Sequence, residues 1–226
     1  MKATNRRLAS NIAEKNRLFL TLHHKVNHSF MKKGFILLLT ALLMACQLPA
    51  QNWDINTVKK VNDWDVHGLS RGLSHSGLIL SVGLPSAMGI YALIQKDEPL
   101  LKDAIYIGTS VIEAVGITYA MKYSIDRQRP YEKYPGLITP IEAEDSPSFP
   151  SGHTAAAFSL ATSLSIKYPK WYVIAPSAVW ACGVGFARIN QGVHYPSDVL
   201  TGAAIGVGCA FVNVYVNRWL NKLLFE

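Results

Sequence analysis

Cysteine and charge are both scarce in this sequence. The 226 residues contain only three cysteines, Cys46, Cys182 and Cys209, and 16% of the residues are charged. Three cysteines with no pair at the short spacing of a metal site exclude a disulfide scaffold and a zinc module. The sequence also contains no internal repeats, nucleotide-binding glycine loops or low-complexity tracts. Half of the residues are hydrophobic, so the chain is ordered and long enough to bury a sizeable core.

The positive net charge of +7 comes from one end of the chain. Residues 1–30 contain six Lys and Arg against a single acid, Glu14, and Lys32 and Lys33 follow directly. From residue 34 onward, fourteen basic residues balance fourteen acidic ones. Because the main body is neutral, the basic pI indicates targeting or the choice of start site, and we predict no nucleic-acid partner.

Residues 31–50 have the pattern of an export signal. Met31, Lys32 and Lys33 form a charged start, and a run of about a dozen apolar residues follows. Cleavage after Ala50 is the first interpretation; lipoprotein processing at Cys46 and an uncleaved anchor are the alternatives. If Met31 is the true start, residues 1–30 are an upstream extension. In each case the chain enters the export pathway.

The rest of the chain, residues 51–226, is predicted to be one all-α helical bundle. Residues 51–76 have the mixed periodicity of an amphipathic helix at an interface. Long apolar segments follow, most of them near the length that crosses a bilayer once their flanks are included. They cover 77–94, 104–121, 154–166, 171–187 and 199–216. We therefore predict an integral membrane protein with five spans, or six if residues 31–50 remain attached.

The placement of lysine and arginine favours a membrane bundle over a soluble one. If the first apolar segment begins outside, the connections alternate and six basic residues fall on the inner side: Lys96, Lys102, Lys167, Lys170, Arg218 and Lys222. This asymmetry follows the positive-inside rule, and a soluble bundle has no reason to show it. The small-xxx-small pattern from Gly202 to Gly206 further predicts close helix contact within the bilayer.

Three polar clusters lie in connections that this topology places together on the outer side. Their members suit one anion: guanidinium groups bind phosphate oxygens with two donors, a helix start offers free backbone N–H groups, and paired histidines can divide the roles of nucleophile and general acid. A carboxylate can hold one imidazole in the tautomer that leaves its other nitrogen free. The candidates are Lys122 and Arg129, then Ser151, Gly152 and His153, and finally Arg188, His194 and Asp198.

These clusters resemble the three signature motifs of the type 2 phosphatidic acid phosphatase superfamily. The matching patterns are Lys122-x6-Arg129-Pro130, Pro150-Ser151-Gly152-His153 and Arg188-x5-His194-x3-Asp198. One position departs from the family, which commonly has serine where this chain has Ala187 before the third-motif arginine. That serine contributes at most a minor phosphate contact, so the departure puts little in doubt.

The resemblance implies a role for each residue. His194 would attack phosphorus and form a phosphohistidine, Asp198 would orient it, and His153 would protonate the leaving group. The phosphoryl oxygens would be bound by Lys122, Arg129, Ser151, Gly152 and Arg188. The resemblance also implies a helical bundle and a reaction without a metal or other cofactor.

The predicted function is hydrolysis of a lipid phosphate or diphosphate at the outer face of a bacterial inner membrane, facing the periplasm. Undecaprenyl diphosphate, phosphatidylglycerol phosphate, phosphatidate and lipid A phosphates are the candidate substrates. The alternatives are a soluble periplasmic acid phosphatase, a lipid phosphoryl-group transferase using the same site and, less favoured, a vanadium haloperoxidase. The loop at 135–148 is predicted to control access, Arg71, His67 and His75 are weaker headgroup candidates, and Arg127 falls in the variable spacer of the first motif.

Overall fold

The computed structural model describes residues 51–225, which belong to one compact unit, Gln47–Glu226. The predictions for residues 1–30 and 31–50 therefore lie outside the described residues. Within them the chain forms helices and connecting loops, with no strand. The helices are α2 (Gln51–Asn62), α3 (His67–Gln95), α4 (Glu98–Ile125), α5 (Pro130–Lys133), α6 (Gly152–Lys167), α7 (Trp171–Asn190) and α8 (Pro196–Phe225).

The all-helical prediction is confirmed, and each predicted apolar segment lies within a longer helix. The amphipathic prediction for 51–76 was too long, because the chain turns after Asn62 and begins α3 at His67. The turn between α3 and α4 is tight. Lys96 adopts a left-handed conformation with φ 55°, and the Asp97 side chain accepts a hydrogen bond from the backbone N–H of Leu100 at 3.0 Å. This carboxylate caps one of the free donors at the start of α4.

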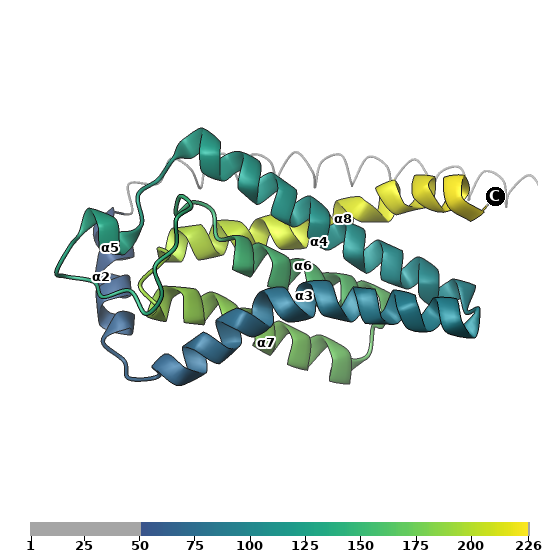
Figure 1. The fold of residues 1–226 in the computed structure, drawn as a ribbon, viewed down its shortest axis with the longest axis horizontal. Coiled ribbons are helices and arrows are strands. Elements are labelled where there is room, and N and C mark those ends of the chain that lie inside the picture. Colours follow the sequence, from purple (N-terminus) through teal and green to yellow (C-terminus); the bar gives the residue numbers. More distant parts are fainter. Residues whose placement is uncertain (1–50, 226) are drawn as a thin grey trace, which may run out of the picture. The chain divides into compact units, whose positions relative to one another are not determined.

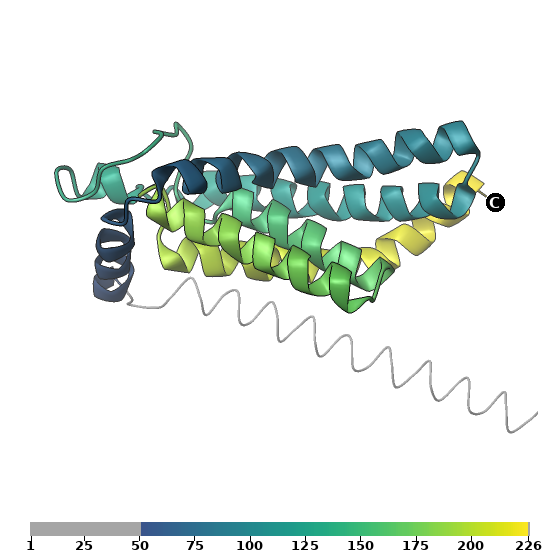
Figure 2. The ribbon, with the colours of Figure 1, turned by 90° about the horizontal axis from the view of Figure 1, so that it is seen from below.

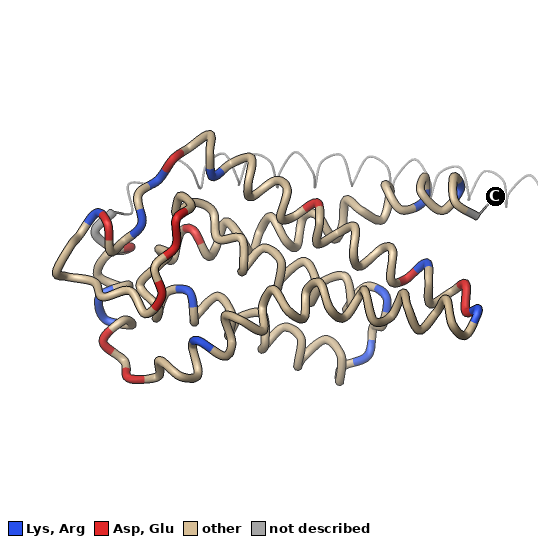
Figure 3. Tube along the Cα trace, in the orientation of Figure 1, with Lys and Arg blue, Asp and Glu red and all other residues tan. Residues whose placement is uncertain are grey.

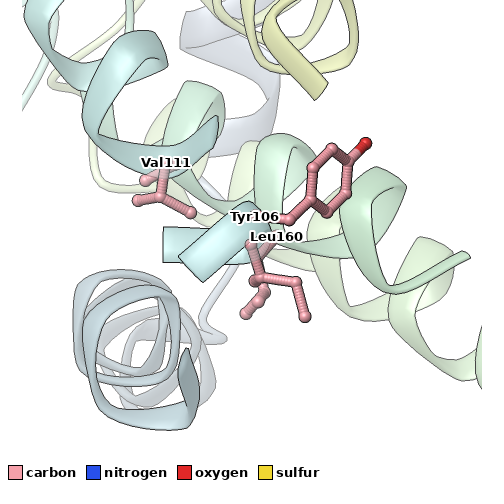
Figure 4. Packing of buried hydrophobic residues seen from close by; sticks show 5 residues of the cluster. Tyr106, Val111 and Leu160 are labelled. Atoms are coloured by element: carbon pink, nitrogen blue, oxygen red, sulfur yellow. The ribbon is translucent and has the colours of Figure 1, made fainter. Parts of the chain in front are cut away.

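Five helices, α3, α4, α6, α7 and α8, run alongside one another, and the short α2 and α5 lie at one end (Figures 1 and 2). The central helix is α6, which packs against all four of the other long helices. Its alanines are fully buried, which allows its neighbours to approach closely. Between α4 and α6, the side chains of Tyr106, Val111 and Leu160 form part of a buried apolar cluster (Figure 4).

Helix α8 packs directly on the backbone of α6, as the small-residue pattern predicts. A methyl group added at Gly202 would lie 2.5 Å from the carbonyl oxygen of Ser151, and one at Gly206 would lie 2.3 Å from that of Ala155. Both distances are too short for a carbon atom. Glycine at these positions therefore allows the second and third turns of α8 to pack against the start of α6, close to the second polar cluster.

This packing gives a stability prediction. Gly206→Ala is expected to lower the free energy of unfolding by about 1–3 kcal/mol, because the two helices must separate to admit the methyl group. Thermal unfolding of the purified protein in detergent should show a midpoint several degrees lower. Gly116→Ala is the matched control, since an added methyl there meets nothing within 4 Å. Equal midpoints for the two variants would contradict the close contact.

Four of the helices are long and apolar enough to cross a membrane, and these are α3, α4 with its extension, α7 and α8. Large apolar side chains such as Ile94, Ile112 and Val179 are about 70% exposed along them. Helix α6 has 16 residues and is enclosed by the others. An apolar girdle of this kind is costly in water and favourable in lipid. The chain is therefore a membrane protein. Four of the five predicted spans are long and apolar enough to cross a membrane, and α6, the fifth, is not.

Charged residues gather at the two ends of the bundle and leave the middle nearly free of charge (Figure 3). Glu113, in the middle of α4, is the exception. The end away from α2 carries the six basic residues named above against three acids, Asp97, Glu98 and Asp103. Two of these acids pair with lysines, at 2.5 Å for Glu98–Lys102 and 2.9 Å for Asp103–Lys167. The α2 end carries the other eight Lys and Arg of the described residues together with nine acids, so the two ends differ in net charge and not in their number of basic residues.

Candidate active site

The three polar clusters meet at the α2 end of the bundle. The first follows the end of α4, the second begins α6, and the third joins α7 to α8. A backbone hydrogen bond of 3.1 Å from Ser151 N–H to the carbonyl of Asp198 joins the second cluster to the third. Another of 3.1 Å, from Ile141 N–H to the carbonyl of Gln191, ties the loop before α6 to the end of α7. The structure thus brings together the residues that the sequence analysis selected.

His194 is held between a carboxylate and an arginine. Its side chain is 1% exposed, with Nδ1 3.4 Å from Oδ2 of Asp198 and Nε2 3.4 Å from Nη1 of Arg129. A proton on Nδ1 facing the carboxylate leaves the lone pair on Nε2, which faces the cationic side of the site. Asp198 is fully buried. This is the orientation that a histidine nucleophile requires.

Arg129 and Arg188 are drawn together by one carboxylate, that of Glu144. Arg129 Nη2 donates to Oε2 of Glu144 at 2.6 Å, and Arg188 Nη2 donates to Oε1. Arg188 also donates to Ser74 Oγ at 2.6 Å and to Gln191 Oε1 at 2.8 Å, which fixes its guanidinium against α3. Two guanidinium groups on opposite oxygens of one anion form the geometry with which arginines bind phosphate.

The loop that contains Glu144 also provides carbonyl acceptors for the cations of the site. Arg129 donates from Nε to the carbonyl of Ser146 at 2.7 Å and from Nη1 to that of Val193 at 2.8 Å. Lys122 is buried and donates to the carbonyl of Pro147. Among the described residues, Nε of Arg188 has no hydrogen-bond partner. The loop from Glu144 to Pro147 therefore acts as an internal ligand for the cations predicted to bind phosphate.

The second cluster begins helix α6. Ser151 is buried, its hydroxyl is 2.9 Å from that of Thr154, and its backbone N–H is already bound to Asp198. Gly152 and His153 are the first helical residues, so their N–H groups have no acceptor within the helix. A methyl group at Gly152 would meet Thr118 at 3.8 Å, an ordinary contact. Packing against the protein therefore does not require glycine there, whereas close approach of an anion would.

The electrostatics of the site favour neutral histidines and an ionised carboxylate. Burial, and then the positive charges of Arg129 and Arg188, hold the pKa of His194 well below its usual value. Burial and the charge of Arg188 lower the pKa of His153 to about 3. For Glu144, burial alone would raise the pKa, but Arg188 and Arg129 outweigh it and lower the pKa to about 2. At neutral pH His194 is therefore unprotonated and nucleophilic, and Glu144 is a carboxylate.

Several residues of the site were not assigned from the sequence. Glu144 was assigned only to an access loop, and Arg127 to a spacer, but Arg127 Nη1 lies 2.5 Å from Oδ1 of Asp198. Ser148 donates to Oδ2 of the same carboxylate at 2.5 Å. Asp54 of α2 is also buried beside them. The burial of Asp54 could have been predicted from the sequence, because Asp54 lies four residues before the buried Val58 and therefore on the same face of the amphipathic helix.

The weaker headgroup candidates hold the access loop. Arg71 Nε and His75 Nε2 both contact the carboxylate of Glu142, at 2.8 Å and 3.1 Å, and all three side chains are about half exposed. His67 is exposed at the first turn of α3. Two acids on one loop are therefore fixed by cations, Glu142 on the outside and Glu144 in the site.

The position of Glu144 gives a kinetic prediction. Glu144→Gln is expected to lower KM for a phosphate substrate about threefold to tenfold and to strengthen inhibition by inorganic phosphate, because an internal competitor for the two arginines loses its charge. Initial rates over a substrate series would measure it. Glu142→Gln is the control, since its partners lie outside the site. A higher KM in Glu144→Gln than in the control would contradict the competition.

Long apolar helices around a cluster of buried arginines and histidines define a class of helical membrane proteins with an anion site at one end of the bundle. Within that class, a sequence model of the PAP2 superfamily matches residues 103–222, more than half of the chain. The match runs from α4 into the last part of α8 and contains all three polar clusters. The chain belongs to the PAP2 superfamily, as the motif resemblance implied.

Curated relatives of the chain act on phosphorylated lipids, by their names. A lipid A 1-phosphatase of Porphyromonas gingivalis is 35% identical over 114 residues, covering 49% of this chain and 22% of that protein. A decaprenylphosphoryl-5-phosphoribose phosphatase of Mycobacterium tuberculosis is 31% identical, covering 61% and 72%. An undecaprenyl-diphosphatase of Bacillus subtilis is 29% identical, covering 65% and 78%. The chain thus spans about a fifth of the first relative and about three quarters of the other two.

Two solved structures share the fold. The phosphatidylglycerolphosphate phosphatase of Bacillus subtilis aligns with a TM-score of 0.62 and 25% identity, covering 85% of this chain and 98% of that one. Aquifex aeolicus LpxE aligns with a TM-score of 0.60 and 26% identity, covering 72% and 95%. The likeness therefore extends over nearly the whole of both structures.

Proposed function

We propose that this protein is a phosphatase of lipid phosphates or diphosphates that works through a phosphohistidine and needs no metal. One observation carries the proposal: Nε2 of buried His194 lies 3.4 Å from Arg129, Arg129 shares the Glu144 carboxylate with Arg188, and Asp198 lies behind the other nitrogen of His194. A phosphoryl group that replaced the Glu144 carboxylate would sit on both guanidinium groups, beside the nucleophilic nitrogen. The lipid phosphatases among its relatives support the same chemistry.

The first proposed step forms the phosphohistidine. The lone pair on Nε2 of His194 forms a bond to phosphorus, the bond from phosphorus to the leaving oxygen breaks, and that oxygen takes its proton from His153. The phosphorylated imidazole carries a positive charge, which the Asp198 carboxylate stabilises across 3.4 Å. His153 is neutral in the free protein, so its proton must come with the substrate or be bound once the negative phosphate arrives.

The second step is hydrolysis. Water attacks phosphorus, the P–N bond breaks, and its electron pair returns to Nε2 while the proton of the water passes to His153. Arg129, Arg188 and Lys122 hold the phosphoryl oxygens throughout and stabilise the charge that builds in the transition state. Release of inorganic phosphate would let Glu144 return to the arginines.

We place the site at the periplasmic face of a bacterial inner membrane. The end of the bundle opposite the site carries six basic residues against three acids, and connections with an excess of basic residues normally remain in the cytoplasm. The apolar girdle then sets the site at headgroup depth, which favours lipid substrates over soluble ones. The same girdle disfavours a soluble periplasmic acid phosphatase.

The experiment is phosphate release by the detergent-purified protein in excess EDTA. Undecaprenyl diphosphate, phosphatidate and p-nitrophenyl phosphate serve as parallel substrates. We expect EDTA-resistant turnover of at least one lipid and slower turnover of p-nitrophenyl phosphate. Complete loss of activity in EDTA with recovery on adding a divalent metal would overturn the metal-free mechanism. Turnover that required a lipid alcohol as acceptor would instead indicate a phosphoryl-group transferase.

A further inference from the structure

The carboxylate of Asp198 has partners that the three motifs do not supply. Its Oδ2 accepts from Ser148 Oγ at 2.5 Å and from the backbone N–H of Tyr195 at 2.9 Å, and it faces Nδ1 of His194. Its Oδ1 accepts from Nη1 of Arg127 at 2.5 Å. Arg127 is thus the cation in direct contact with the carboxylate behind the proposed nucleophile.

Arg127 is partly exposed, but its guanidinium group has several protein partners. It lies just past the end of α4, and its Nη1 also donates to Ser197 Oγ at 2.8 Å. Its Nη2 donates to Oδ2 of Asp54 at 3.0 Å, and its guanidinium carbon lies 3.9 Å from the centre of the Tyr195 ring. A guanidinium with this many partners has lost its rotational freedom, so its charge is held in place beside Asp198.

Asp54 ties this arrangement to α2. Besides Arg127, its carboxylate accepts from both the backbone N–H of Ser197 at 3.0 Å and the hydroxyl of Ser197 at 2.5 Å. Ser197 is in the first turn of α8, one residue before Asp198, so Asp54 satisfies a free donor at a helix start. Asp54 is 2% exposed and lies outside the part of the chain that the family model matches.

We propose that Arg127 and Asp54 are positioning residues for the reaction: Arg127 keeps Asp198 ionised and turned toward His194, and Asp54 holds Arg127 in place. The proposal rests on the proposed phosphohistidine mechanism and adds two residues that no motif contains. Helix α2 then belongs to the working site, not only to the surface of the bundle.

The physical reason is the cost of burying a charge. A fully buried carboxylate stays ionised only when a countercharge is close, and without one it binds a proton more readily. The charged and titratable groups around Asp198 are Lys122 from α4, Arg127 from the connection after α4, Asp54 from α2, and His194 and Tyr195 from the preceding loop. A protonated Asp198 cannot stabilise the positive charge on phosphorylated His194, so loss of Arg127 should slow the chemistry more at low pH than at high pH.

The test compares pH profiles of kcat for phosphatidate in detergent micelles. Arg127→Gln is expected to lower kcat about 10- to 100-fold near neutral pH with little change in KM, and to move the acidic limb of the profile to higher pH, so that activity partly returns in alkali. Arg127→Lys keeps the charge and should lose less. Asp54→Asn should lower kcat without moving the acidic limb upward, because it removes a negative charge near Asp198.

Matched controls separate positioning from folding. Lys133→Gln and Asp63→Asn change exposed charges of the same kinds near the site and should leave kcat and its pH profile unchanged. An Arg127→Gln protein that folds in lower yield but keeps the wild-type kcat and pH profile for its folded fraction would overturn the proposal. An upward shift of the acidic limb that also occurred in Lys133→Gln would overturn it too.

A second readout does not depend on turnover. In proton NMR, the Nδ1–H of His194, which faces the Asp198 carboxylate, should give a downfield signal that persists to lower pH in the wild type than in Arg127→Gln. If the wild type hydrolysed no phosphate, the proposed function would fail while this signal still tested the charge of Asp198. The same signal and pH dependence in both proteins would overturn the role of Arg127.

Discussion

The His194→Ala protein is expected to release phosphate from a lipid substrate at least about 10⁴-fold more slowly than the wild type. Alanine removes the proposed nucleophile, the imidazole nitrogen that lies 3.4 Å from Arg129. Binding should survive, because the arginines remain. KM is therefore expected to change far less than kcat, which initial rates in detergent micelles would measure.

A trapping experiment tests the same prediction by detecting the phosphohistidine intermediate. With a ³²P-labelled substrate and a quench in alkaline detergent, which preserves phosphohistidine, the wild type should retain label and His194→Ala should not. His67→Ala is the control, because His67 is an exposed histidine at the start of α3. Label that remained at the wild-type level in His194→Ala would show that another residue is the nucleophile.

The sequence was sufficient for the helices and for the motif residues of the site, because both depend on local patterns. Apolar runs of bilayer length produced each long helix, and helix direction placed the polar connections at one end. Helix ends were less predictable. The α4 helix begins before its predicted apolar segment because Asp97 caps it there. The close contact of Gly202 and Gly206 with α6 was also readable, because small residues four apart leave one face of a helix flat.

The partners of the charged residues were not predictable from the sequence. Glu144 and Arg188 are 44 positions apart, and Asp54 and Arg127 are 73 apart. A local sequence pattern cannot predict ion pairs this far apart, and more than one acidic residue of the access loop could have paired with the arginines. The burial of Arg127 is likewise set by where α2 crosses the end of the bundle, which depends on a packing of α2 against α7 and α8. Local sequence preferences determine the helices of this protein, whereas ion pairs between distant residues determine the hydrogen-bond partners in the site.

His153→Ala is expected to slow hydrolysis of phosphatidate by about 10²- to 10⁴-fold, the usual contribution of a general acid. The alkoxide that leaves from a lipid phosphate is a strong base and needs a proton as its bond to phosphorus breaks. p-Nitrophenolate is a weak base and leaves without one. The first step with p-nitrophenyl phosphate should therefore proceed at nearly the wild-type rate, whereas the hydrolysis step, which uses His153 as a base, should be slow.

Rapid-mixing measurements would separate the two steps. His153→Ala should give a burst of p-nitrophenol equal in amount to the enzyme, followed by a slow steady state, and this burst should be absent in His194→Ala. Asp198→Asn is the informative comparison, because it weakens the nucleophile and should slow the burst itself. Equal slowing of the first step for both leaving groups in His153→Ala would contradict a proton transfer from His153. A burst that depends on the leaving group would assign the proton to His153 and the phosphoryl group to His194 in one experiment.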